Sequence, residues 1–147
     1  MPEKATLERA RRDKREGKSP STQAGEFVRE EIHHVREGKH GARSAKQAIA
    51  IGLSKARRAG VKLGKPPAGS SEGTKRSASS ARKRSGKSTS PSRSRATRQA
   101  LKREPHRTAS QEALSRQAKS AARKRSASSR SAAAHKAART RRRLAAA

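Results

Sequence analysis

The chain has 147 residues, with 40 Lys and Arg against 11 Asp and Glu, and a formal net charge of +29 at pH 7. Leu, Ile, Val and Phe together contribute only 13 residues. So low an apolar share at so high a charge is typical of chains that cannot bury enough surface to offset their ordering entropy, which excludes one compact globule of this length. The lack of cysteine excludes disulfides, cysteine-based zinc sites and thiol catalysis. No apolar run approaches the ~18 residues of a membrane span, and none resembles a secretory signal, so we expect a cytoplasmic protein.

Charge and apolar residues divide the chain unequally. Residues 1–63 hold 16 basic and 8 acidic side chains, a net charge of +8, whereas residues 64–147 hold 24 and 3, a net charge of +21. Ten of the 13 large apolar residues lie between Leu7 and Leu63. The sequence therefore predicts a mostly α protein. It would have a short N-terminal helical hairpin of two or three helices in 1–63, a Pro/Gly/Ser linker at 64–74, and a low-complexity basic tail at 75–147. We expect the tail to be largely disordered, with conditional helices.

The N-terminal region carries three helix signals. Residues 3–16 are mostly strong helix formers with one large apolar residue, which indicates a solvated helix ended by Gly17. Ser19 is placed to cap a second helix that ends at Gly38, and Ser44 with Gln47 fits a capping box for a third helix that ends at Gly60.

The second and third helices each carry an apolar stripe at helical spacing. The predicted packing residues are Phe27, Val28, Ile32 and Val35 in the second helix and Ala48, Ile49, Gly52, Leu53 and Ala56 in the third. We expect the two helices to pack as a hairpin across the loop 39–43. So small a core is marginal alone, and dimerisation through the module or nucleic-acid binding would supply the missing stability.

The tail consists mainly of Ala, Ser, Lys and Arg, and the hexamer Lys-Arg-Ser-Ala-Ser-Ser occurs at 75–80 and again at 124–129. Residues 108–125 and 131–147 are rich in Ala and Arg, so we expect them to become helical when a polyanion removes their charge repulsion. Lysine and arginine neutralise phosphates without sequence specificity. The candidate nucleic-acid-binding residues are the tail clusters Arg82, Lys83, Arg84, Arg123, Lys124, Arg125, Arg141, Arg142 and Arg143, joined by Lys55, Arg57 and Arg58 of the third helix.

Duplex DNA is favoured over RNA, because single-stranded recognition uses aromatic platforms and Phe27 is the one aromatic residue. His33, His34 and His40 lack ligands at a recognisable metal-binding spacing, so we predict no metal and no cofactor. No catalytic residues are predicted, because so small a core offers no pocket for a positioned Ser–His–acid set. Serines beside arginine, such as Ser77 and Ser94, resemble kinase target sites, although a soluble spacer is the simpler interpretation.

Residues 26–63 resemble a known family, most clearly at residues 27–34, 38–41 and 46–60. The family comprises small basic bacterial proteins that form a domain of unknown function, with a histidine-bearing helix, a Gly/Lys loop and a "KQAIAIGLSxAR" helix. The resemblance implies a bacterial cytoplasmic source and carries over no activity. The tail is similar in composition to the basic tails of linker histones and of bacterial histone-like proteins.

These observations favour a non-enzymatic, histone-like protein of the bacterial nucleoid that neutralises duplex DNA through its tail. Two alternatives remain open. One is an RNA- or ribosome-associated protein. The other is a helical interaction module whose row of small residues, Ala48, Gly52 and Ala56, docks an acidic protein partner.

Overall fold

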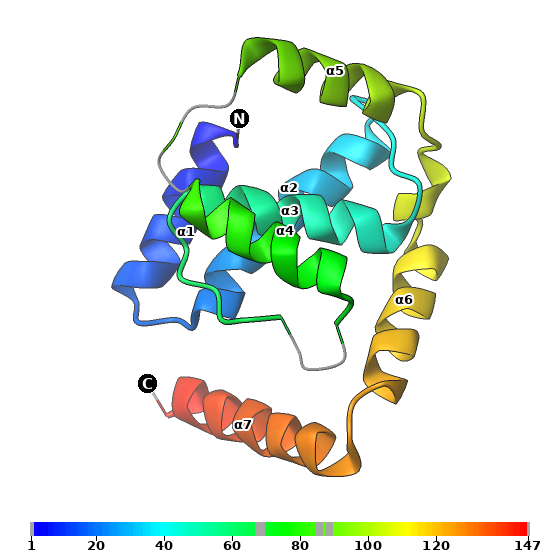
Figure 1. Cartoon of the computed structure of the whole chain (residues 1–147). Helices are drawn as coiled ribbons and strands as arrows, with labels where there is room; N and C mark the ends of the chain where they lie inside the picture. Colours follow the sequence, from blue (N-terminus) through cyan, green and yellow to red (C-terminus); the bar gives the residue numbers. More distant parts are fainter. Residues whose placement is uncertain (1, 67–69, 85–86, 88–89, 147) are drawn as a thin grey trace. The chain divides into compact units, whose positions relative to one another are not determined.

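The computed structural model describes residues 2–66, 70–84, 87 and 90–146. The elements in chain order are α1 (Lys4–Arg15), α2 (Pro20–Arg36), α3 (Ala45–Arg58), α4 (Glu72–Lys83), α5 (Pro91–Lys102), the 3-10 turn η1 (Arg107–Ala109), α6 (Gln111–Arg123) and α7 (Ala127–Ala145) (Figure 1). Contacts divide the chain into a unit Met1–Leu114 and a unit Ser115–Ala147. None of the helices in these described segments is long and apolar enough to cross a membrane.

The fold is mostly α, as predicted, but the prediction of a long disordered tail is wrong. The described residues after position 70 form the four helices α4 to α7. Alanine, arginine and lysine are strong helix formers, and serine caps supply the local start signals. Ser71 and Ser126 each accept a hydrogen bond from a backbone N–H three residues on, at 3.3 and 3.2 Å. The prediction of disorder rested on the apolar content, which limits how much surface a chain can bury. That content does not report helix propensity or capping. Within the predicted linker 64–74, residues 67–69 lie outside the described residues.

Helix α2 lies between α1 and α3 in the first unit and packs against both. One buried cluster joins the three helices through Ala10, Ala24, Phe27 and Ala56, with Leu7, Leu53, Val61 and Leu63 packed against it. A second cluster joins α2, α3 and η1 through Val35, Ala42, Ala48 and Ala109, with Ile32 beside it. Helix α4 packs against α3 and buries Ala78 and Ala81.

Helices α2 and α3 approach each other closely at Gly52. A Cβ atom at this position would lie 2.6 Å from the Cα of Val28 and 3.0 Å from the carbonyl oxygen of Phe27. The predicted packing residues all lie at least partly inside, with Phe27, Val35, Ala48, Gly52 and Ala56 buried and Val28, Ile32, Ile49 and Leu53 half-buried. Because α2 covers the row of small residues on α3, that row is not an exposed surface for an acidic protein partner.

The helix ends follow the predicted capping with one difference. The hydroxyl groups of Ser19 and Ser44 each accept a hydrogen bond from the first turn of their helices, at 3.4 and 3.2 Å. The side chain of Gln47, however, accepts from the backbone N–H of Arg43 at 2.6 Å, one residue before the position that a capping box requires. Gly60 ends α3 with a left-handed φ of +87°.

The loop between α2 and α3 is held by a segment far along the sequence. The backbone N–H of Gly41 donates to the carbonyl of Leu101 at 2.8 Å, and that of Ala42 donates to the carbonyl of Pro105 at 3.1 Å. The side chain of Thr108 returns a hydrogen bond to the carbonyl of Ala42 at 2.8 Å. The last turn of α5 and the stretch that follows it therefore fix the conformation of the hairpin loop.

Candidate nucleic-acid interface

Three helices share one arrangement of basic side chains. Each places three of them at positions i, i+3 and i+7, which at 100° per residue fall within about 60° of the helix circumference. We call these sets basic stripes. They are Arg95, Arg98 and Lys102 on α5, Arg116, Lys119 and Arg123 on α6, and Lys136, Arg139 and Arg143 on α7. All nine side chains are exposed.

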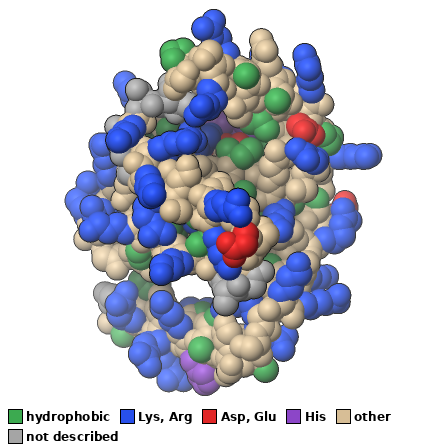
Figure 2. Space-filling view, viewed as in Figure 1, with side chains coloured by type: hydrophobic (Ala, Val, Ile, Leu, Met, Phe, Trp, Pro, Cys, Tyr) green, Lys and Arg blue, Asp and Glu red, His purple; other side chains and the backbone are tan. Residues whose placement is uncertain are grey.

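The basic stripes of α5 and α7 lack compensating charge, whereas α6 carries Glu112 one turn before Arg116 on the same face. Helices α5 and α7 contain no Asp or Glu, and the segment 115–147 carries 11 Lys and Arg without any acidic residue. Within the described ranges, no ion pair joins a stripe residue to a carboxylate. Figure 2 shows Lys and Arg side chains spread over the visible face with few acidic neighbours. Like charges three or four residues apart destabilise a helix by about 0.2–0.5 kcal/mol per pair, so an anion bound along a stripe relieves a repulsion.

The length of a basic stripe matches the spacing of phosphates on a duplex. Seven helical residues rise about 10.5 Å, and one strand of DNA carries a phosphate about every 3.4 Å along the axis. Each stripe therefore presents three cations over about three phosphate intervals of one strand.

The basic clusters predicted from the sequence do not form single faces of the helices, unlike the basic stripes. Arg82 and Lys83 end α4, with Arg84 just after it. Arg123 ends α6 and precedes Lys124 and Arg125, while Arg141, Arg142 and Arg143 lie in the last turns of α7. Consecutive residues on a helix point 100° apart, so a run of three does not form one face. Of these nine residues, Arg123 and Arg143 belong to stripes. A search of the tail at helical spacing would have found the other stripe residues.

The predicted basic residues of α3 have unequal access to solvent. Arg58 is exposed, whereas Arg57 is half-buried. Burial, together with the nearby guanidinium of Arg82 on α4, lowers the pKa of Arg57. Lys55 is occupied by ion pairs with two buried carboxylates, so its ammonium group is not free to reach a phosphate.

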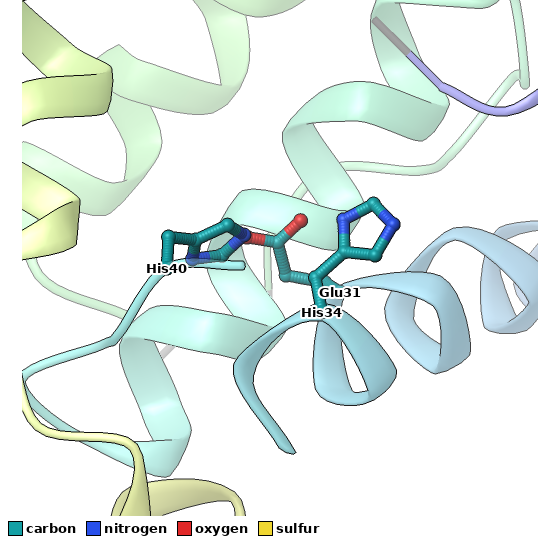
Figure 3. A group of neighbouring side chains, drawn as sticks. All are labelled: Glu31, His34 and His40. Atoms are coloured by element: carbon teal, nitrogen blue, oxygen red, sulfur yellow. The ribbon is translucent and has the colours of Figure 1, made fainter. Parts of the chain in front are cut away.

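A second group of functional side chains lies at the C-terminal end of α2. Ligand atoms of Glu31, His34 and His40 all lie within 4.8 Å of one another (Figure 3). Glu31 is fully buried, and its Oε1 lies 3.2 Å from Nε2 of His40. The ammonium of Lys55 lies 2.6 Å from Oε2 of Glu31 and 3.1 Å from Oε1 of Glu30.

Residues outside this cluster orient its two imidazole rings. Nδ1 of His40 lies 3.0 Å from the carbonyl oxygen of Gly41, and Nε2 of His34 lies 2.8 Å from Oε1 of Glu3. The hydrogen bond with His34, followed by contacts with Lys39, lowers the pKa of Glu3, so this carboxylate is ionised at neutral pH. A polar cavity of about 430 Å³ between α1 and α2 is lined in part by Glu3 and His34.

No metal site was predicted, because the spacing of His33, His34 and His40 in the sequence does not show which of these side chains lie close together in the fold. His33 is exposed and lies outside the cluster, although it lines the cavity beside His34. The pair Glu31 and His34, three residues apart on one helix, could have indicated two ligands on the same face. The contribution of His40 depends on the hairpin loop, which local spacing does not predict.

Comparison with known proteins finds a match for one segment of the chain. No curated protein and no solved structure matches the chain. The resemblance seen in the sequence to an uncharacterised domain family is confirmed, over a segment that includes α2, α3 and the cluster of Glu31, His34 and His40. Residues 14–67 match the model of a family described as "Family of unknown function (DUF6496)".

Proposed function

We propose that the protein binds nucleic acid without sequence specificity, with duplex DNA as the preferred partner, through the basic stripes of α5, α6 and α7. The observation that supports this function is that three helices each carry three exposed cations along one side, with no ion pair to a carboxylate among the residues that the structure describes. Binding releases the counterions condensed on the phosphates, which favours association whatever the base sequence.

The composition favours backbone contacts over base reading. Contacts to phosphate position a protein on the duplex and carry no sequence information directly. Recognition of splayed bases relies on aromatic stacking, and the one aromatic residue, Phe27, is buried between helices. These features favour a non-enzymatic architectural protein, which in a bacterial cell would associate with the nucleoid.

The second unit gains stability from such binding. Neither α6 nor α7 contains a buried residue in the described chain, so their stability comes from caps and intrinsic helix propensity. Phosphates placed along the stripes would add attraction and remove repulsion among the stripe cations. Binding and helix stability are therefore coupled.

The test measures affinity of the full chain for a labelled 30-base-pair DNA duplex by fluorescence anisotropy between 50 and 300 mM salt. The logarithm of the binding constant should fall linearly with the logarithm of salt concentration. Its slope should approach about −8 if all nine stripe residues contact phosphates, at about 0.9 per phosphate. A slope shallower than about −2 would contradict the proposal.

A duplex of unrelated sequence and an RNA duplex of the first sequence serve as comparisons. The two DNA duplexes should bind equally, because the stripes contact only the backbone. Tighter binding to the RNA duplex would contradict the preference for DNA and favour the RNA-associated alternative.

A further inference from the structure

We propose that Glu31, His34 and His40 form a binding site for a transition-metal dication, with Zn²⁺ as the best match. The site lies in the helical hairpin and is separate from the proposed nucleic-acid interface. Three geometric observations support it, one for each residue.

The first is the orientation of His40. Its Nδ1 faces the carbonyl oxygen of Gly41 at 3.0 Å, and because a carbonyl only accepts, Nδ1 must carry the proton. The other ring nitrogen, Nε2, then lies 3.2 Å from Oε1 of Glu31, and no hydrogen bond joins the two atoms. A dication held between these two atoms would give the buried carboxylate the partner that it lacks. A histidine whose other nitrogen donates to a backbone carbonyl is the usual arrangement in metal sites.

The second observation is the matching orientation of His34. Its Nε2 lies 2.8 Å from Oε1 of Glu3, and when Nε2 donates to that oxygen the lone pair is on Nδ1. Figure 3 shows a ring nitrogen of His34 on the side that faces Glu31. A carboxylate that orients a histidine in this way fixes its tautomer and raises its basicity as a metal ligand.

The third observation is the buried carboxylate itself. Glu31 has no solvent exposure, and neither of its oxygens has a hydrogen-bond partner within the described chain. Lys55 balances its charge from 2.6 Å at Oε2, but without hydrogen-bond geometry. Because Lys55 also pairs with Glu30, Oε1 of Glu31 is left to a cation on the histidine side. A buried carboxylate normally requires such compensation.

The ligand set indicates the class of metal. Two imidazoles and one carboxylate, with a fourth position open to water, are a zinc ligand set, and imidazole also suits copper and nickel. Metal–ligand distances of about 2.0–2.2 Å place tetrahedral ligands about 3.4 Å apart. Oε1 of Glu31 and Nε2 of His40 already have about this separation, at 3.2 Å, and the ligand atoms that are farther apart, up to 4.8 Å, would move closer together around the ion.

The test titrates chelator-stripped, nuclease-treated full-length protein with Zn²⁺ by isothermal titration calorimetry. The wild type should bind one equivalent, and Co²⁺ should give the intense visible absorption of a tetrahedral site. His34→Gln and His40→Gln should each lose the stoichiometric site. Glu3→Gln should weaken binding by about 10- to 100-fold, because its carboxylate only orients His34. The matched control is His33→Gln, next to His34 but exposed, which should bind as the wild type does.

Circular dichroism at 222 nm checks that each variant keeps its helices. If a variant does not fold, a measurement on the wild-type protein alone still tests the proposal. In ¹⁵N NMR spectra, Zn²⁺ should shift Nδ1 of His34 and Nε2 of His40 and leave His33, His106 and His135 unchanged. The proposal is overturned if the wild type binds no Zn²⁺, or if His33→Gln weakens binding as much as His34→Gln. It is also overturned if His40 proves to be an imidazolium paired with Glu31 that zinc does not perturb.

Discussion

The basic stripe on α7 gives the sharpest test of how the protein would meet DNA. Replacing Lys136, Arg139 and Arg143 by Gln removes the whole stripe and three positive charges. Glutamine keeps the helix propensity close to that of the residues it replaces, so the helix should persist. We expect this variant to bind duplex DNA more weakly and with less dependence on salt.

The size of the effect follows from the number of phosphates that the stripe reaches. Three contacts at about 0.9 each lower the steepness of the salt dependence by about 2.7. Between 50 and 200 mM salt, the wild type should therefore lose about 40-fold more affinity than the variant. Fluorescence anisotropy over that range measures the difference directly.

The matched control removes the same charge from other faces of the same helix by replacing Arg130, Arg141 and Arg142 with Gln. At 100° per residue, none of these three positions falls within the arc of the stripe. The control should change the slope clearly less than the stripe variant does. Equal changes in slope would refute the stripe as a binding face and leave only the bulk net charge as the cause.

Two predictions concern the helical hairpin. Gly52→Ala should destabilise the protein by about 1–2 kcal/mol because its Cβ would meet the backbone of α2, whereas Gly25→Ala should stabilise it by about 0.5–1 kcal/mol because nothing lies within 4 Å. Denaturation followed at 222 nm checks both signs, and a stable Gly52→Ala would contradict the close packing. Burial raises the pKa of Glu30, but hydrogen bonds, including one from Lys55, outweigh it and hold the pKa below its ordinary value. The stability from this carboxylate is therefore present at neutral pH and lost as pH falls through the lowered pKa. Glu30→Gln should lower stability at pH 7 and flatten its decline below about pH 4.5, as acid titration would show.

The helices that the sequence predicts well are those with signals inside one or two turns. The caps at Ser19 and Ser44 and the apolar stripe around Phe27 depend on residues three or four positions apart, so the sequence contains them completely. The tail was misjudged for the opposite reason. Its prediction rested on the apolar surface available for burial, while its helices are specified by Ala and Arg propensity and by caps such as Ser126.

The contacts that could not be predicted join distant parts of the chain. The hairpin loop takes its conformation from backbone hydrogen bonds to residues some sixty positions away, at Leu101 and Pro105. That loop brings His40 to Glu31, and Glu3 reaches His34 across 31 residues. No spacing pattern in the sequence predicts these contacts. Every residue has the same backbone carbonyl group, and a single ion pair does not produce a repeating pattern.

The charge of the chain acts differently in its two halves, for a physical reason. Most of the ion pairs lie within residues 1–63, where Lys18, Lys39 and Lys55 are held by carboxylates and contribute to the fold. Their charge is largely neutralised within the module and offers little to a phosphate. The stripe cations have no such partners in the described chain, so their attraction to a polyanion is undiminished. The acidic residues concentrated in residues 1–63 therefore have two roles. They stabilise a small helical module, and they provide Glu31, in a chain whose remaining surface repels cations.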